Sequence, residues 1–170
     1  FNLKRMNETI FWNMIEQAWD EISPLLKTKR LQIAVEKDFK EPTELGMELS
    51  DLVASDLVEN LSAKLEKVSK EDLLAFDRLL EQKLYDIDRA DIHAYTDGSD
   101  DGFLYCRGFI VGMGQAYYEL VKNEPASATT DLDAESFCYF PRHLYRNLHG
   151  EFTISAISRE TASNEAGWKV

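Results

Sequence analysis

The sequence Asp97-Gly98-Ser99-Asp100-Asp101-Gly102-Phe103 runs into Leu104-Tyr105-Cys106-Arg107-Gly108-Phe109-Ile110-Val111-Gly112, and this is the most informative stretch of the chain. Its first part places carboxylate and hydroxyl oxygens in a tight turn, and its second part is apolar. Ser99 or Asp100 can accept hydrogen bonds from the unpaired backbone amides that begin a helix, and Asp101 suits the positive end of the helix dipole. The stretch therefore predicts a capped, buried helix over residues 100–122.

The same turn partly fits a calcium-binding loop. Asp97, Ser99 and Asp101 occupy its first, third and fifth positions, with Gly102 at the sixth. The twelfth position is Gly108, where a calcium loop needs a bidentate glutamate. We therefore favour helix capping over a metal site.

The predicted helix carries small residues at every fourth position, Gly108, Gly112 and Ala116. Glycine costs a helix about 1 kcal/mol relative to alanine, so two of them on one face need a reason. A close crossing with another helix is the interpretation that we favour. A ligand that rests on the bare backbone is the alternative.

Arg107 places a charge within this apolar helix. A half-buried guanidinium needs a compensating group, and Asp88, Asp91 or Asp101 could supply a carboxylate. We expect a buried ion pair that ties the turn to the helix, with binding of a substrate anion as the alternative.

Amphipathic spacing predicts further helices on both sides. Asn7 caps a helix that Pro24 ends, and Ser69 with Asp72 fits a capping box before another helix. A long helix is predicted over residues 44–68. It has an apolar residue at every fourth position, namely Leu45, Leu49, Val53, Leu57, Leu61 and Leu65.

This spacing of four does not match a regular helix. Each four-residue step turns about 400°, so the apolar row drifts by about 40° per step. The long helix should therefore either contact partners on two sides or bend. Its first half also carries acids with no base between them, which we interpret as a protein-binding patch: Glu44, Glu48, Asp51, Asp56 and Glu59.

Other segments leave alternatives open. The alternation of Leu31, Ile33 and Val35 fits a short strand or a continued helix, and residues 152–157 fit a strand. We predict a mainly α, single-domain bundle of about five to six helices over residues 1–150, with room for one or two short strands. A tail over residues 151–170 is expected to be partly ordered at most.

Composition narrows the class of partner. The 170 residues hold 31 acids and 19 bases, a net charge of −12. Nucleic-acid binding requires an excess of bases, so we expect no nucleic-acid partner, and an anionic membrane is disfavoured too. No run reaches the roughly 18 apolar residues of a membrane span. A basic protein partner fits this charge.

Composition also bears on location and chemistry. Cys106 and Cys138 make no disulfide framework, so we expect them to be reduced and buried. The first residues are too quickly polar for a signal peptide, which favours a cytoplasmic location. No phosphate loop, nucleophile elbow or zinc-protease motif occurs. We therefore expect no cofactor and no metal, and we favour a protein that is not an enzyme.

Three blocks of sequence resemble a known bacterial family, the domain of unknown function 4240. They are Phe11-Trp12-x-x-Ile15, Leu73-Leu74-Ala75-Phe76-Asp77, and the stretch from Ser99 to Ile110 with Gly114, Tyr117 and Tyr118. The likeness covers residues 7–125. Phe109 stands where the family pattern has tryptophan, and residues 91–95 lack its Trp- and Ala-rich stretch. The resemblance implies a small, mainly helical, cytoplasmic protein and implies no particular reaction.

Two functional hypotheses follow. The first is an acidic, non-enzymatic module that binds a basic protein through the acids from Glu44 to Glu59 and from Asp86 to Asp101, such as an immunity-type protein that neutralises a basic toxin domain. The second is a small-ligand or metal pocket, even a catalytic one, at the turn. Its residues would be Asp97, Ser99, Asp100, Asp101 and Arg107.

Overall fold

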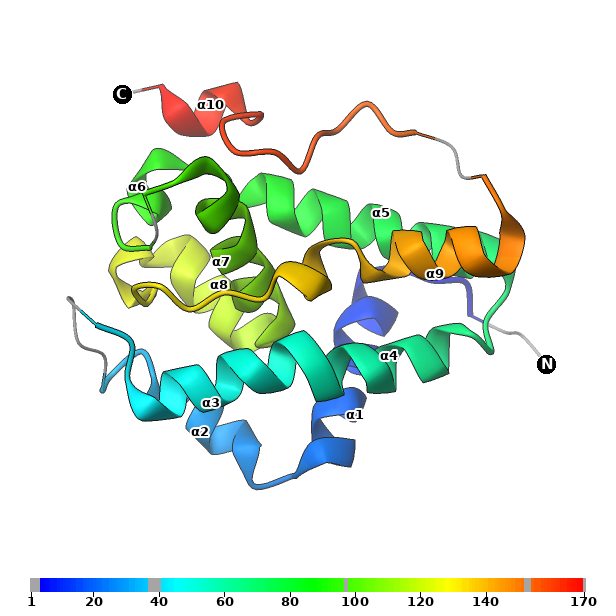
Figure 1. Cartoon of the computed structure of the whole chain (residues 1–170), viewed down its shortest axis with the longest axis horizontal. Coiled ribbons are helices and arrows are strands. Elements are labelled where there is room, and N and C mark those ends of the chain that lie inside the picture. The colour runs from blue at the N-terminus through cyan, green and yellow to red at the C-terminus, as the bar shows by residue number, and fades with distance from the viewer. Residues whose placement is uncertain (1–3, 37–40, 97, 152–153, 170) are drawn as a thin grey trace.

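The computed structural model describes residues 4–36, 41–96, 98–151 and 154–169, which form a bundle of helices (Figure 1). In chain order the elements are α1 (Glu8–Ile22), α2 (Leu26–Gln32), α3 (Glu44–Leu52), the π-helical turn η1 (Val53–Leu57), α4 (Val58–Leu65), α5 (Lys70–Asp86), α6 (Ala90–His93), α7 (Asp100–Gly112), α8 (Gln115–Asn123), the 3-10 turns η2 (Pro125–Ser127) and η3 (Glu135–Cys138), α9 (Phe140–His149) and α10 (Glu165–Trp168). The mainly α prediction is confirmed.

The helices are more numerous than the five to six predicted, and the described residues contain no strand. The strand alternative for Leu31 to Val35 is wrong, because α2 continues to Gln32. Residues 154–157 are not a strand either, and residues 152 and 153 lie outside the described part of the chain.

Polar side chains cap several helices as the sequence predicts. Asn7, Ser69 and Ser99 each accept a hydrogen bond from the backbone amide three residues further on. Each bond satisfies one of the amides that the first turn of a helix leaves unpaired. The capping box at Ser69 is half formed, because the carboxylate of Asp72 accepts instead from the backbone amide of Met6.

The long helix predicted over residues 44–68 is α3, η1 and α4 in one continuous run. A π turn holds more residues per turn than an α-helix, so η1 offsets part of the drift of the apolar row. The row contacts α1 on one side and η3 and α9 on another, so the predicted two-sided contact is confirmed. Its members from Leu49 onward are completely buried: Leu49, Val53, Leu57, Leu61 and Leu65.

The single helix predicted over residues 100–122 is wrong, because α7 and α8 are separated by a break. Gly114 adopts φ +97°, a backbone conformation that L-residues other than glycine rarely adopt. The break frees carbonyls at the end of α7, and the Trp19 indole donates to Gly112 O at 2.8 Å while Arg30 donates to Met113 O at 2.7 Å.

The glycines of α7 allow close packing, as predicted. A Cβ added at Gly108 would lie 2.5 Å from Cys138 Sγ, and one at Gly112 would collide with the side chain of Val53. The alternative of a ligand on this bare backbone is wrong, because η3 and η1 occupy it. Ala116 lies beyond the break and is exposed.

The described part of the tail, residues 154–169, lies along α5 from the end of α9 to α6 (Figure 1). The division into a domain over residues 1–150 and a tail stays a prediction. No helix in the described residues combines the length and apolar character that a membrane crossing requires.

Candidate functional site

The turn before α7 is a helix cap. Ser99 Oγ accepts from Gly102 N at 3.0 Å, and the side chains of Asp100 and Asp101 are exposed. The hydroxyl of Thr161 in the tail donates to the backbone carbonyl of Asp100 at 2.5 Å. Asp97, also predicted as a site residue, lies outside the described part of the chain.

Arg107 is completely buried, and the ion pair predicted for it is wrong. Its guanidinium donates to Leu84 O at 2.8 Å and to Arg159 O at 2.9 Å, with a longer contact to Thr161 Oγ1. It also lies 4.8 Å from the centre of the Phe103 ring. Leu84 is in the last turn of α5, where carbonyl oxygens carry the negative end of the helix dipole, so backbone and ring replace the expected carboxylate.

Burial affects the pKa of the Arg107 guanidinium more strongly than any neighbouring charge does. Loss of water lowers its pKa, and the nearby negative charge of Asp88 opposes that shift. Asp91, the other acid considered as its partner, pairs instead with Arg89 at 2.6 Å. Asp100, Asp101 and Arg107 thus do not converge on one cleft.

Asp88 holds the end of the tail, a role that no sequence pattern predicts. Its buried carboxylate accepts from Ala162 N at 3.0 Å, from Asn164 N at 2.9 Å and from the Trp168 indole at 2.9 Å. The indole ring of Trp168 also contacts the rings of His93 and Phe103. Asp88 therefore fastens residues 162–168 onto α6 and α7.

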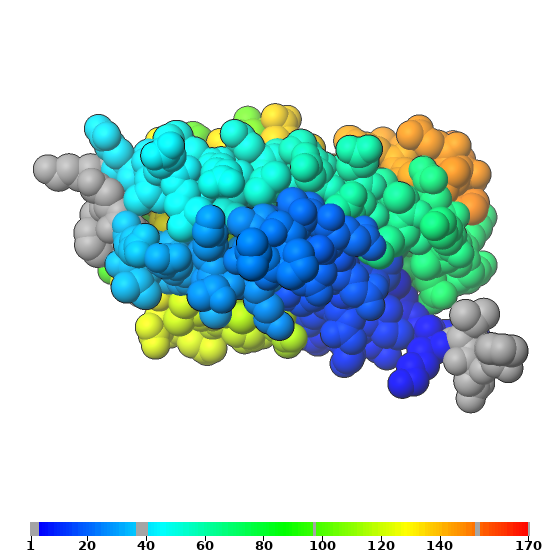
Figure 2. Space-filling view, turned by 90° about the horizontal axis from the view of Figure 1, so that it is seen from below, coloured from blue at the N-terminus to red at the C-terminus, as the bar shows by residue number. Residues whose placement is uncertain are grey.

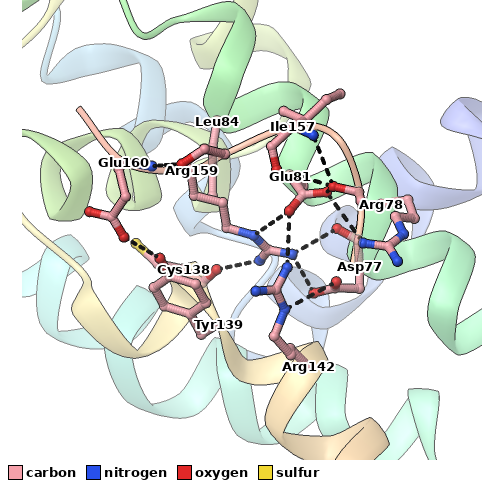
Figure 3. Close-up of polar contacts among 12 residues, drawn as sticks. Asp77, Arg78, Glu81, Leu84, Cys138, Tyr139, Arg142, Ile157, Arg159 and Glu160 are labelled. Carbon is pink, nitrogen blue, oxygen red and sulfur yellow. Dashed lines mark hydrogen bonds and ion pairs between the residues drawn. The ribbon is translucent and has the colours of Figure 1, made fainter. Parts of the chain in front are cut away.

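A second buried charge cluster lies nearer the middle of α5 (Figure 3). Asp77 and Glu81 are 1% and 2% exposed and face two arginines, Arg142 from α9 and Arg159 from the tail. Arg159 lies 2.7 Å from Asp77, and Arg142 lies 2.9 Å from Glu81. Arg159 also donates to Cys138 O at 2.6 Å. The cluster joins α5, η3, α9 and the tail.

The sequence contained one signal for this cluster. Asp77 and Glu81 fall beside Leu73, Leu80 and Leu84, on the helix face that is otherwise apolar and buried. A carboxylate at such a position requires a buried partner. Within the described residues, no group of three His, Cys, Asp or Glu side chains lies close enough together to hold a metal ion.

Both cysteines are free and buried, as predicted. Burial raises the pKa of the Cys138 thiol from 9.0 to about 12, although Arg107 and Arg159 act in the opposite direction. Such a thiol stays protonated at neutral pH and is a poor nucleophile.

The acidic patch predicted on the long helix is an exposed row of carboxylates, which we call the acidic stripe: Glu44, Glu48, Asp51, Asp56 and Glu59. It follows the outer side of α3, η1 and α4, which together cross one face of the molecule (Figure 2). None of the five forms an ion pair with another described residue.

A groove of about 570 Å³ lies beside this stripe, between α4 and α9. Val58, Phe140 and Leu144 give it an apolar lining, and Glu135 and His143 add charge or polarity. The sequence does not predict this groove, because α4 and α9 are far apart in the chain.

The residues that carry the family resemblance are mostly buried. Phe76, Asp77, Phe103, Arg107 and Tyr118 are each at most 1% exposed. These residues build the core and its charged contacts, whereas the acidic stripe lies on the surface.

Comparison with curated proteins finds no match, and comparison with solved structures finds none either. Residues 47–147 match the model of a family described as "Protein of unknown function (DUF4240)". The match extends from α3 to α9 and leaves out α1, α2 and the tail. Because it spans more than half of the chain, the resemblance seen in the sequence is confirmed, and the protein belongs to this DUF4240 family.

Proposed function

We propose that this protein is a non-enzymatic binding module that recognises a basic protein through the acidic stripe. The observation that carries the proposal is the row of five exposed carboxylates without a basic partner among the described residues. Like charges three or four residues apart on a helix destabilise it by a few tenths of a kcal/mol per pair. The stripe therefore costs the fold stability, and a cationic partner would offset that cost.

The whole-molecule charge supports the same function. A net charge of −12 attracts a basic partner over long range and raises the rate of encounter. One specific form is an immunity-type protein that neutralises a basic toxin domain. We place the protein in the cytoplasm, because two free thiols fit a reducing compartment.

The buried charged groups favour this function over catalysis at Arg107. The guanidinium already donates to two backbone carbonyls, and the Asp77 and Glu81 carboxylates are matched by arginines. A small-ligand or metal site at Ser99, Asp100 and Asp101 stays a prediction, which thermal unfolding with divalent metals and metabolites tests.

The test of the proposal is capture of partners from a lysate of the source organism, with three baits. They are the wild-type chain, a stripe variant (Glu48→Lys, Asp51→Lys, Asp56→Lys) and a control variant (Glu124→Lys, Glu151→Lys, Glu165→Lys). The control acids are also exposed and lie outside the long helix, and three acids become lysines in each variant, so both variants change the net charge equally.

We expect one basic protein on the wild-type and control baits at low salt, and its loss on the stripe variant and at high salt. Equal retention by all three baits would show that the stripe is not the binding surface. A partner that is lost equally from both variants would show that only net charge matters.

A further inference from the structure

The groove between α4 and α9 provides an apolar pocket directly beside the acidic stripe. Val58 and Ser62 form its α4 wall, and Glu59 of the stripe lies next to Val58 in the chain. Phe140, Leu144 and Asn147 come from α9. The groove and the stripe therefore share α4, and one partner segment could contact both.

Apolar surface continues outward from the groove along α9. Phe140, Leu144 and Leu148 are spaced by four residues, so they follow one side of the helix. Phe140 is 6% exposed, Leu144 is half-buried and Leu148 is 46% exposed. A pocket with an exposed apolar margin is typical of a surface that binds another protein.

The charges around the groove indicate the chemistry of its occupant. Glu135, an exposed residue of η3, lines the groove, and Glu59 of the stripe lies on α4. On the α9 wall, His143 stacks on Tyr139 with ring centres 6.4 Å apart. The nearby arginine Arg142 is 19% exposed and turned to Asp77 and Glu81. Glu135 in the lining and Glu59 next to Val58 in the chain thus place carboxylates at this groove.

We propose that this groove binds an apolar side chain of the basic partner, from a segment in which lysine or arginine flanks that side chain. The apolar side chain fills the space between Val58 and Leu144, and the flanking cations meet Glu135 and the stripe. This inference rests on the proposed function and adds the anchor that gives specificity, because exposed charge pairs alone contribute little affinity.

The direct test uses the methyl-labelled 170-residue chain and NMR spectroscopy. The probe is a short synthetic peptide with one phenylalanine flanked on each side by two lysines. Matched peptides replace the phenylalanine by alanine or the lysines by glutamate. We expect the methyl signals of Val58 and Leu144 to shift with the phenylalanine peptide, and about ten- to a hundredfold weaker binding of the alanine peptide. The glutamate peptide should not bind.

A matched pair of variants controls for folding. Asn147→Trp fills the groove from an exposed position on α9, whereas Asn123→Trp makes the same change at an exposed position on α8. We expect the first variant to weaken peptide binding at least tenfold and the second to leave it unchanged. Absence of shifts at Val58 and Leu144 at millimolar peptide, or equal binding of the alanine peptide, would overturn the inference.

The same variants separate this inference from the proposed function. If the stripe variant loses the captured basic protein while Asn147→Trp retains it fully, the acidic binding function stands and the groove is not its anchor. If both lose it and Asn123→Trp does not, both proposals are supported.

Discussion

At the scale of single residues, most of the buried charge in this protein is structural. The sequence predicts a carboxylate partner for Arg107, but its partners in the structure are backbone carbonyls. A guanidinium has five N–H donors; at Arg107 two backbone carbonyls, one in the last turn of α5 and one in the tail, take the place of the expected carboxylate, while the buried Nε has no hydrogen-bond partner among the described residues. The sequence shows that Arg107 needs acceptors, but it does not show which carbonyls the fold brings there.

Replacement of Arg107 by methionine should destabilise the fold strongly. The change leaves Leu84 O and Arg159 O buried without a donor, and we expect a loss of about 2–4 kcal/mol in the free energy of unfolding, measured by urea denaturation. Lys29→Met, at an exposed position on α2, should cost less than about 0.5 kcal/mol. Similar costs for the two variants would contradict the structural role of Arg107.

The free energy of unfolding should fall in alkaline solution, because the thiol of Cys138 is buried in its neutral form. The native thiol has a pKa of about 12 against the ordinary 9.0, so above pH 9 the unfolded chain ionises while the native chain does not. Stability is thus full below pH 9 and decreases as the pH rises, by about 1 kcal/mol at about pH 10 for this thiol alone.

Urea unfolding at about pH 8 and about pH 10 tests whether the free energy of unfolding falls as the pH rises. Burial raises the pKa of Tyr117 and Tyr118 in the same direction, so Cys138→Ala should reduce the decrease and not abolish it. Unchanged or greater stability at the higher pH would contradict the burial of neutral groups that we describe.

At the scale of elements, the beginnings of helices were predictable and their interruptions were not. Asn7, Ser69 and Ser99 cap helices through contacts only three residues away, so local sequence suffices. The break at Gly114 depends on Trp19 and Arg30, whose donors reach the carbonyls that the break exposes. Such long-range partners leave no local pattern.

Gly114→Ala should therefore lower the free energy of unfolding more than the same change at Gly150 or Gly98. An alanine there combines positive φ with a collision against Glu16, and its Cβ would lie 2.8 Å from Arg30 Nη1. We expect a loss of about 2–3 kcal/mol by urea denaturation. Gly150→Ala has positive φ without a collision and should cost about 1 kcal/mol, and Gly98→Ala should be nearly neutral.

The attachment of the tail depends on Asp88. Asparagine has the same shape but one acceptor oxygen, so Asp88→Asn cannot accept all three bonds from Ala162, Asn164 and Trp168. We expect a loss of about 1–3 kcal/mol, a red shift of Trp168 fluorescence and faster proteolysis within residues 154–169. Asp91→Asn, at an exposed position, is the control. An unchanged proteolysis pattern would contradict the role of Asp88.

At the scale of the whole molecule, Asp77 and Glu81 in the interior pair with arginines, whereas the acidic stripe on the surface has no basic partner among the described residues. The acidic stripe was visible in the sequence, because five acids without an intervening base stand on one predicted helix. The groove was not visible, because it requires α4 and α9 to lie side by side. The residues that match the family model, 47–147, include the residues that line the groove and four of the five stripe acids.

Recognition through the acidic stripe is tested by measuring the affinity of the captured basic protein for the wild-type chain, the stripe variant and the control variant over a series of salt concentrations. We predict that the stripe variant binds at least about tenfold more weakly at low salt and that its salt dependence is much shallower. The control variant should stay close to wild type. Equal affinities and equal salt slopes for all three chains would contradict recognition through the acidic stripe.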